Sequence, residues 1–201
     1  IMHTEIAQVL DFWFEGYPNS RLPQSEQIQR WFKVDPAFDE AMRNRLGGLY
    51  TQACEGKLAD WAQTPEGALA LVILLDQGSR NLWRGSGQAF AWDSAACQVA
   101  QTLCDQGWDQ DLPPLARLFV YLPFEHSENL ADQHKAVEKC QALHDQAPPE
   151  LKDATAGFLD YAEKHLAVIE RFGRFPHRNE RLNRVSTPEE IAFLSQPGSA
   201  F

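Results

Sequence analysis

The chain has 201 residues, 44% of them hydrophobic and 23% charged, so it is long enough to bury a core without disulfides or metal ions. Its formal net charge of -10 argues against binding to nucleic acid or to an anionic membrane, because phosphate contacts need a basic surface. The longest apolar run, residues 68–75, is far shorter than the ~20 residues that span a bilayer.

The first residues and the cysteines bear on the compartment. Glu5 and Asp11 fall in the first apolar stretch and no basic stretch precedes it, so we expect no secretion signal and a cytoplasmic protein. The cysteines show no CxxC pair and no histidine at zinc-ligand spacing, which argues against structural zinc. We therefore expect no metal, no cofactor and four free thiols, at Cys54, Cys97, Cys104 and Cys140.

Apolar residues at helical spacing, bounded by capping residues, prolines and glycines, predict about nine helices. In chain order they cover approximately residues 4–14, 24–32, 36–55, 65–77, 93–106, 114–122, 128–144, 149–172 and 188–194. No run alternates apolar and polar residues for long enough to predict a strand. Short connections between helices indicate an all-α protein of stacked antiparallel helical hairpins, in a single domain of residues 1–201.

Several helix boundaries have explicit sequence signals. A capping side chain followed by proline opens three helices, at Asp35, Thr64 and Thr187, and the last of these belongs to a capping box. Residues 78–87 are rich in glycine, serine and charge, which predicts a connection. Gly47 and Gly48 interrupt the third helix, which predicts a kink or the close approach of another helix.

The first polar segment lies at the predicted end of the apolar helix 65–77. It contains Asp76, Arg80, Asn81 and Arg84. An acid at a helix C-terminus is unfavourable, because that end of the helix dipole attracts cations. We therefore expect Arg80 to neutralise Asp76.

The second polar segment is the sequence Glu125-His126-Ser127-Glu128, between two predicted helices. The dipole of the following helix explains Glu128 and, more weakly, Glu125, but it does not explain His126. Ser127 beside His126 suggests a nucleophile and its base, but sequence neighbours rarely face each other correctly, and no GxSxG turn is present. His126 is therefore a candidate acid or base.

The third polar segment, residues 171–184, holds five of the chain's twelve arginines together with His177. His165 lies about two turns before it on the same predicted helix. Gly173 and Pro176 force the residues from Arg174 to Asn179 out of helical geometry. Such a concentration of basic residues in a loop of an acidic protein points to a partner.

Convergence of the three segments would leave about two positive charges in excess, which would suit an anionic ligand. Arginine binds carboxylate or phosphate with two parallel hydrogen bonds, and histidine can move protons near neutral pH. The candidate catalytic residues are Glu125, His126, His165 and His177. The candidate ligand-binding residues are Asp76, Arg80, Asn81, Arg84, Glu128, Arg171, Arg174, Arg178 and Asn179.

Three other interpretations remain open from the residues alone. The charged residues could form a structural ion-pair network with no ligand. The histidines and glutamates include suitable metal ligands, although the neighbouring arginines would repel a cation. Stacked helical hairpins also form concave grooves, in which arginines could bind an acidic peptide or a C-terminus.

The same motifs carry a resemblance to a known family. DFWF (11–14), LLDQ (74–77), RN and WRG (80–85), AF..D (89–93), LPFEHSE (122–128), H...I.RFGRFPHRN (165–179) and STPEE (186–190) resemble the DUF924 family of uncharacterised bacterial proteins. The resemblance implies a helical, TPR-like fold and no established activity, cofactor or catalytic residue. The family usually has Phe-Pro where this chain has Gly78-Ser79, and glycine where it has Asn183. Loss of that proline predicts a less rigid segment from Asp76 to Arg80.

Overall fold

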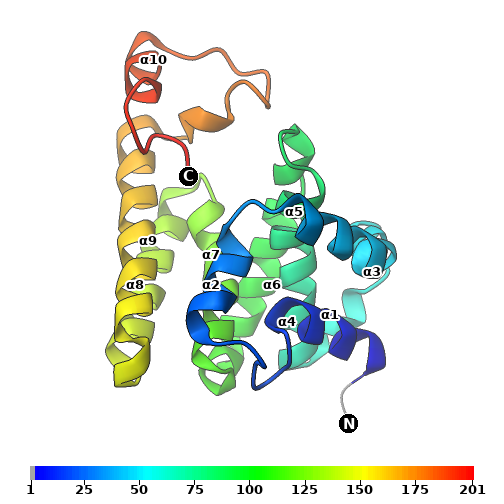
Figure 1. Cartoon of the computed structure of the whole chain (residues 1–201). Helices are drawn as coiled ribbons and strands as arrows, with labels where there is room; N and C mark the ends of the chain where they lie inside the picture. Colours follow the sequence, from blue (N-terminus) through cyan, green and yellow to red (C-terminus); the bar gives the residue numbers. More distant parts are fainter. Residues whose placement is uncertain (1–2) are drawn as a thin grey trace.

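The apolar faces predicted from the sequence pack together in the computed structural model, which describes residues 3–201 (Figure 1). Those residues form helices and turns, and no strand occurs among them. The helices are α1 (Thr4–Phe14), α2 (Gln24–Phe32), α3 (Pro36–Cys54), α4 (Pro65–Ile73), α5 (Ser79–Leu82), α6 (Asp93–Asp105), α7 (Pro114–His126), α8 (Leu130–Gln146), α9 (Lys152–Phe172) and α10 (Pro188–Leu194). A π-helical turn, Leu74–Gly78, joins α4 directly to α5. With that continuous segment taken as one helix, residues 3–201 contain nine α-helical segments, the predicted number, besides five short 3₁₀ helices.

The core surrounds α4, whose residues from Gly67 to Ile73 are all buried. α4 packs against α1, α6 and α7, while α7, α8 and α9 follow one another as antiparallel neighbours (Figure 1). Large aromatic side chains fill the space between these layers, as where Trp13 meets Phe119 edge to face with ring centroids 5.4 Å apart. The all-helical prediction is therefore confirmed, and a TPR-like superhelix stays a prediction.

The capping signals in the sequence have the expected geometry. The Asp35 carboxylate accepts a hydrogen bond from the Ala37 amide at 2.9 Å, and the Thr64 hydroxyl accepts one from the Gly67 amide at 3.1 Å. Thr187 and Glu190 form the reciprocal hydrogen bonds of a capping box at the start of α10. These side chains satisfy backbone amides that have no partner inside the helix, and so fix where each helix begins.

Three predicted boundaries were wrong. The helix predicted to end at Gln77 continues to Leu82, because the π-helical turn absorbs the irregularity and the Ser79 hydroxyl donates to the Leu75 carbonyl at 2.6 Å. Pro123 lies inside α7 instead of ending it. The helix predicted to begin at residue 128 begins at Leu130, because its cap is Asn129, whose side-chain oxygen accepts from the first amides of that helix.

The paired glycines of α3 neither interrupt the helix nor mark a close approach. α3 is unbroken from Pro36 to Cys54. The nearest atom to a methyl group added at Gly47 would be the Arg43 side chain at 3.8 Å, and a methyl group at Gly48 would meet nothing within 4 Å. No other helix therefore requires a glycine at either position.

The C-terminal part of the chain has a small hydrophobic cluster of its own. Val168, Ile169 and Phe175 form its buried part, and Phe172 of α9 packs on Phe193 of α10 with ring centroids 5.1 Å apart. The main core includes buried residues from Ile6 to Ala162. A single domain of residues 1–201 stays a prediction. None of the described helices is both long enough and apolar enough to cross a membrane.

Candidate functional site

The π-helical turn between α4 and α5 places Asp76 in the interior, where its side chain is 1% exposed. Such turns insert one residue into a helix and often occur at functional sites. The Asp76 carboxylate accepts hydrogen bonds from Arg80 Nη1 at 2.9 Å and from Gln77 Nε2 at 3.1 Å. Burial alone would raise the pKa of this carboxyl, but its contact with His126, the charge of Arg80 and the hydrogen bond from Gln77 hold it well below its usual range. Asp76 is therefore an ionised carboxylate inside the protein.

His126, at the end of α7, bonds to this carboxylate with 2.8 Å between Nδ1 and Asp76 Oδ1. An ionised carboxylate only accepts hydrogen bonds, so Nδ1 carries the proton and Nε2 has a free lone pair. Burial, together with the positive charge of Arg80, lowers the pKa of His126 although Asp76 opposes the shift. His126 is therefore a neutral imidazole at pH 7, held in one tautomer. Nε2 has no protein hydrogen-bond partner within residues 3–201.

Asp93, at the start of α6, contacts two arginines, Arg80 and Arg178. Arg80 bonds to its two carboxylate oxygens at 2.8 and 3.1 Å, and Arg178 Nη1 lies 3.5 Å away. Arg178 Nη2 also donates to the His126 carbonyl at 2.9 Å. These contacts bring together the three polar segments predicted from the sequence, through Arg80, His126 and Arg178.

The Arg178 guanidinium is held between two aromatic rings. It lies 4.5 Å from the centroid of Phe90 and 4.6 Å from that of Phe175. Burial, together with the charge of Arg80, lowers the pKa of Arg178 to about 10, so its surroundings do not fully stabilise the positive charge. Its Nε is buried without a hydrogen-bond partner among the described residues.

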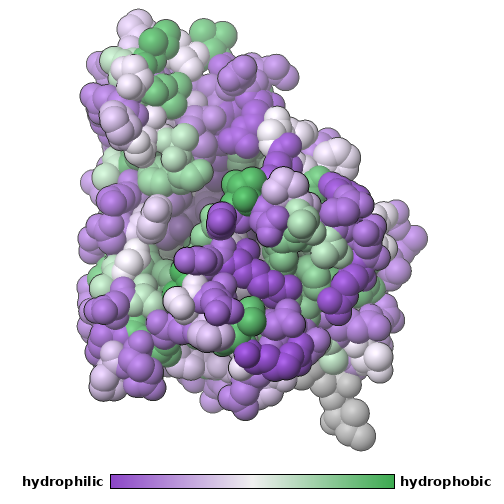
Figure 2. Space-filling view, in the orientation of Figure 1, coloured by the Kyte–Doolittle hydropathy of each residue, from purple (hydrophilic) through white to green (hydrophobic). Residues whose placement is uncertain are grey.

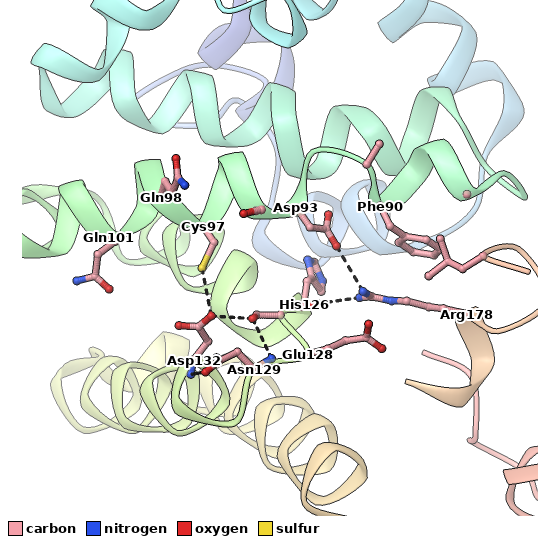
Figure 3. Close-up of a pocket in the computed structure, with 15 residues that line it drawn as sticks. Phe90, Asp93, Cys97, Gln98, Gln101, His126, Glu128, Asn129, Asp132 and Arg178 are labelled. Carbon is pink, nitrogen blue, oxygen red and sulfur yellow. Dashed lines mark hydrogen bonds and ion pairs between the residues drawn. The ribbon is translucent and has the colours of Figure 1, made fainter. Parts of the chain in front are cut away.

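A cavity of about 760 Å³ opens in front of His126 and Arg178 (Figure 3). The first turns of α6 form one wall, and the connection between α7 and α8, with Asp132 just beyond it, forms the opposite wall. The volume is within the range of small-molecule sites. The cavity is lined by Gly87, Phe90, Ala91, Asp93, Ser94, Cys97, Gln98, Gln101, His126, Ser127, Glu128, Asn129, Asp132, Arg178 and Leu182.

Comparison with known proteins shows which family the sequence belongs to. A family model described as a bacterial protein of unknown function, DUF924, matches residues 9–198. The chain belongs to the DUF924 family. A solved structure of a protein of unknown function from Agrobacterium tumefaciens is similar to it, with 36% identity, a TM-score of 0.80, and coverage of 94% of this chain and 96% of that one. No curated protein matches the sequence.

The two departures from the DUF924 motifs have local explanations. Asn183 has a φ of 55°, in the left-handed region that favours glycine and that asparagine tolerates. A side chain at Gly78 would come within 3.2 Å of the Tyr50 ring, so this position packs closely against α3. The Ser79 hydroxyl lies 3.0 Å from the Tyr50 hydroxyl.

Sequence reasoning missed two carboxylates that line the cavity, Asp93 and Asp132. Both lie in the first turn of a helix, where the helix dipole already accounts for an acid, so neither stood out. It also missed Arg184, which donates to both oxygens of Glu128 at 2.8 and 3.1 Å. A signal for Asp93 was present in the AF..D motif of residues 89–93, of which Asp93 is the last residue.

Glu125, His165 and His177 do not line the cavity. His165 Nδ1 is 2.7 Å from the Tyr161 carbonyl and 3.8 Å from Glu125 Oε2, and the Phe201 ring stacks on His165. Burial raises the pKa of Glu125 to about 8 and lowers those of His165 and His177 to about 3 and 4. At pH 7 all three side chains are therefore largely uncharged.

Three predicted ligand-binding arginines lie elsewhere. Arg84 pairs with Asp39 of α3, and Arg174 donates to both oxygens of Glu190 in α10 at 2.9 and 2.7 Å. Arg171 is exposed and covers the Phe172 ring. None of these three arginines lines the cavity, so the expected excess of positive charge is not present around His126.

The two predicted asparagines also have structural positions. Asn179 donates to the Ser186 hydroxyl at 3.0 Å and accepts from Arg184 at 3.0 Å, so it organises the loop after α9. Asn81 is buried in α5, and its amide nitrogen has no hydrogen-bond partner among the described residues. Of the predicted site residues, three line the cavity, namely His126, Glu128 and Arg178.

Proposed function

We propose that this DUF924 protein binds a small polar molecule with a carboxylate or phosphate group in the cavity, and that His126 accepts a proton from it. The 2.8 Å contact between Asp76 and His126 Nδ1 carries the proposal. A buried carboxylate on Nδ1 fixes the imidazole and stabilises the imidazolium that forms when Nε2 takes a proton. Asp76 is a positioning residue and His126 the proposed base.

Arg178 is the proposed partner of the anionic group. Its side chain lines the cavity, and its guanidinium lies against the rings of Phe90 and Phe175. Because burial leaves its charge incompletely stabilised, an anion close to the guanidinium is favoured. A planar guanidinium held in this way also loses little side-chain entropy when a ligand binds.

A small molecule fits this site better than a peptide. A cavity of about 760 Å³ suits a small ligand, whereas an extended peptide needs a long groove. Polar side chains cover most of the face shown in Figure 2, and the hydrophobic ones there lie in small groups. A purely structural network would not require an oriented histidine at the cavity wall.

The test is nitrogen-15 NMR of the histidine rings in the full chain, with phosphate and acetate as probes. We expect His126 in the tautomer protonated at Nδ1, and ring signals that move on addition of either probe at up to about 50 mM, a range that detects millimolar binding. His134, exposed on α8, is the internal control and should not move. Protonation at Nε2, or His126 signals unmoved by both probes, would contradict the proposal.

A pair of variants separates binding from general salt effects. Arg178→Lys keeps the positive charge but loses the planar fork, so the probe-induced shifts at His126 should weaken. Arg84→Lys, at the exposed arginine paired with Asp39, should leave them as in the wild type. Equal responses of the two variants would remove Arg178 from the binding site.

A further inference from the structure

We infer that the ligand is a small zwitterion, with its anionic group at Arg178 and a protonated amine at Asp132. This inference rests on the proposed function, because it concerns a second contact in the same cavity. It follows from the partners of each carboxylate on the cavity wall. Three such carboxylates are present in the described lining, those of Asp93, Glu128 and Asp132.

Two of these carboxylates already have cationic partners. Asp93 is shared by Arg80 and Arg178, and Glu128 receives both donors of Arg184. Each pair neutralises its acid inside the protein. Neither carboxylate therefore leaves a negative charge for a ligand to complement.

Asp132 has no ion-pair partner within residues 3–201. Its contacts are the Ser127 hydroxyl at 2.7 Å and the Cys97 thiol at 3.7 Å, both on Oδ2. Oδ1 has no donor among the described residues. The nearest cation on the same helix, Lys135, donates instead to the Gln101 side chain. A free carboxylate oxygen thus remains at the wall.

The chemistry around Asp132 favours a donor with positive charge. Burial and the charge of Asp132 raise the pKa of Cys97 to about 12, so the thiol stays protonated and adds no competing negative charge. Ser127 and Cys97 hold Oδ2, which fixes the orientation of the carboxylate. A primary ammonium group would supply the missing donor and the opposite charge together.

A second, independent feature of the cavity points to a ligand. Arg178 is only 6% exposed, lines the same cavity, and has an unpartnered Nε within the described chain. An under-stabilised cation and a free carboxylate in the lining of one cavity match a molecule with both charges. A molecule with one charge would leave one of these groups without a partner.

The experiment compares matched sets of probes by the same His126 NMR signals in the full chain. One set is phosphoethanolamine, ethyl phosphate and ethanolamine. The other is the series of ω-amino carboxylates from glycine to aminohexanoate, which varies the separation of the charges, with the corresponding carboxylates and amines. We expect at least one zwitterion to bind about tenfold more tightly than its singly charged counterparts, the gain typical of one charge-assisted hydrogen bond.

Asp132→Asn is the decisive variant, since asparagine keeps the size of aspartate and an acceptor for Ser127. It should remove the zwitterion's advantage over the matched anion-only probe, and it should not weaken binding of that probe, because the substitution only removes a negative charge from the cavity lining. Asp145→Asn, at an exposed position on the same helix outside the cavity, is the matched control and should keep the advantage.

The outcomes separate this inference from the proposed function. Equal binding of zwitterions and anion-only probes, with His126 shifts in both, would overturn the zwitterion and leave the proposed function intact. An advantage that survives in Asp132→Asn would also overturn it. If neither the anions nor the zwitterions move His126, both proposals fail.

Discussion

The buried carboxylate of Asp76 orients the polar side chains around it. It accepts from Arg80 and Gln77 and bonds to His126, so its charge is distributed over three partners from two helices. A buried carboxylate with this set of partners is stable as an anion, and its removal leaves the partners unsatisfied. The tautomer of His126 therefore depends on Asp76.

Asp76→Asn should lower the free energy of unfolding by about 3–5 kcal/mol, the usual cost of removing one member of a buried ion pair. It should also increase the fraction of His126 protonated at Nε2, because the amide lacks the negative charge that favours a proton on Nδ1. Urea unfolding measures the first effect, and nitrogen-15 NMR of the imidazole measures the second.

The control for this variant is Asp39→Asn, which also removes a buried carboxylate paired with an arginine, the exposed Arg84. It should lower stability without any effect on the His126 tautomer, because Asp39 lies outside that network. If the two variants change the tautomer equally, the effect comes from general destabilisation and Asp76 does not position His126.

At the scale of helices, the sequence predicted which segments are helical and where most of them begin. Capping residues and apolar spacing are local properties, and they act before tertiary packing. The π-helical turn could not be predicted, because Gly78 and Ser79 are typical of a helix end. Its stability comes from α3, where Tyr50 packs on Gly78 and lies within hydrogen-bond distance of Ser79.

The candidate site was predictable only in part, for a related reason. Which segments carry unusual charge is visible locally, so His126 and Arg178 were found. Which acid each arginine bonds is decided by the packing of distant helices, so Arg174 was assigned to the site although it binds Glu190. Asp93 and Asp132 were missed because a local explanation, the helix dipole, was sufficient.

The segment before α6 approaches the loop after α9 closely at Gly87, where there is no room for a side chain. A methyl group at Gly87 would lie 2.7 Å from the Arg181 carbonyl oxygen, so Gly87→Ala must displace one of the two segments. We expect a loss of about 1–3 kcal/mol, as for other overpacked positions, and altered His126 NMR signals. Urea unfolding and the NMR spectrum test this.

Gly48→Ala is the control with the opposite sign. Gly48 is an exposed helical residue of α3, and its added methyl group would meet nothing. The substitution should therefore stabilise the protein by about 0.5–1 kcal/mol, because alanine loses less backbone entropy in a helix. A stabilising Gly87→Ala would contradict the close approach described above.

The Arg174 pair belongs to α10 and not to the cavity. Arg174→Gln should increase amide hydrogen exchange of α10 several-fold, because Glu190 loses both guanidinium bonds and only its capping role remains. The His126 signals should stay unchanged. Arg21→Gln, in an exposed pair with Asp11 on α1, should alter neither property. Shifted His126 signals in Arg174→Gln would place Arg174 back in the site.

For the whole molecule, buried titratable groups set how stability depends on pH. His165 and His177 have pKa values of about 3 and 4 in the folded protein, below the ordinary 6.5, because of burial. Between those values and 6.5 the unfolded chain binds more protons, so stability falls as pH falls through this window. Above pH 6.5 these histidines are neutral in both states and no longer contribute.

Glu125 has the opposite effect on how stability depends on pH, and its effect extends to higher pH. Burial raises its pKa from 4.5 to about 8, so between these values the folded protein holds a proton that the unfolded chain has released. Stability therefore decreases as pH rises through this window, and the full cost is present only above it. From pH 6.5 to 8 Glu125 should dominate the pH dependence, with a loss of roughly 2 kcal/mol.

Glu125→Gln isolates this contribution, since glutamine has the same size and cannot ionise. Urea unfolding between about pH 6.5 and 8.5 should show stability falling with pH in the wild type and staying nearly constant in the variant. The variant's advantage should grow with pH and level off above pH 8. Glu138→Gln, at an exposed position on α8, should keep the wild-type slope. Parallel slopes in the wild type and Glu125→Gln would show that Glu125 is already ionised at neutral pH, and the interior would then contain a second negative charge beside Asp76.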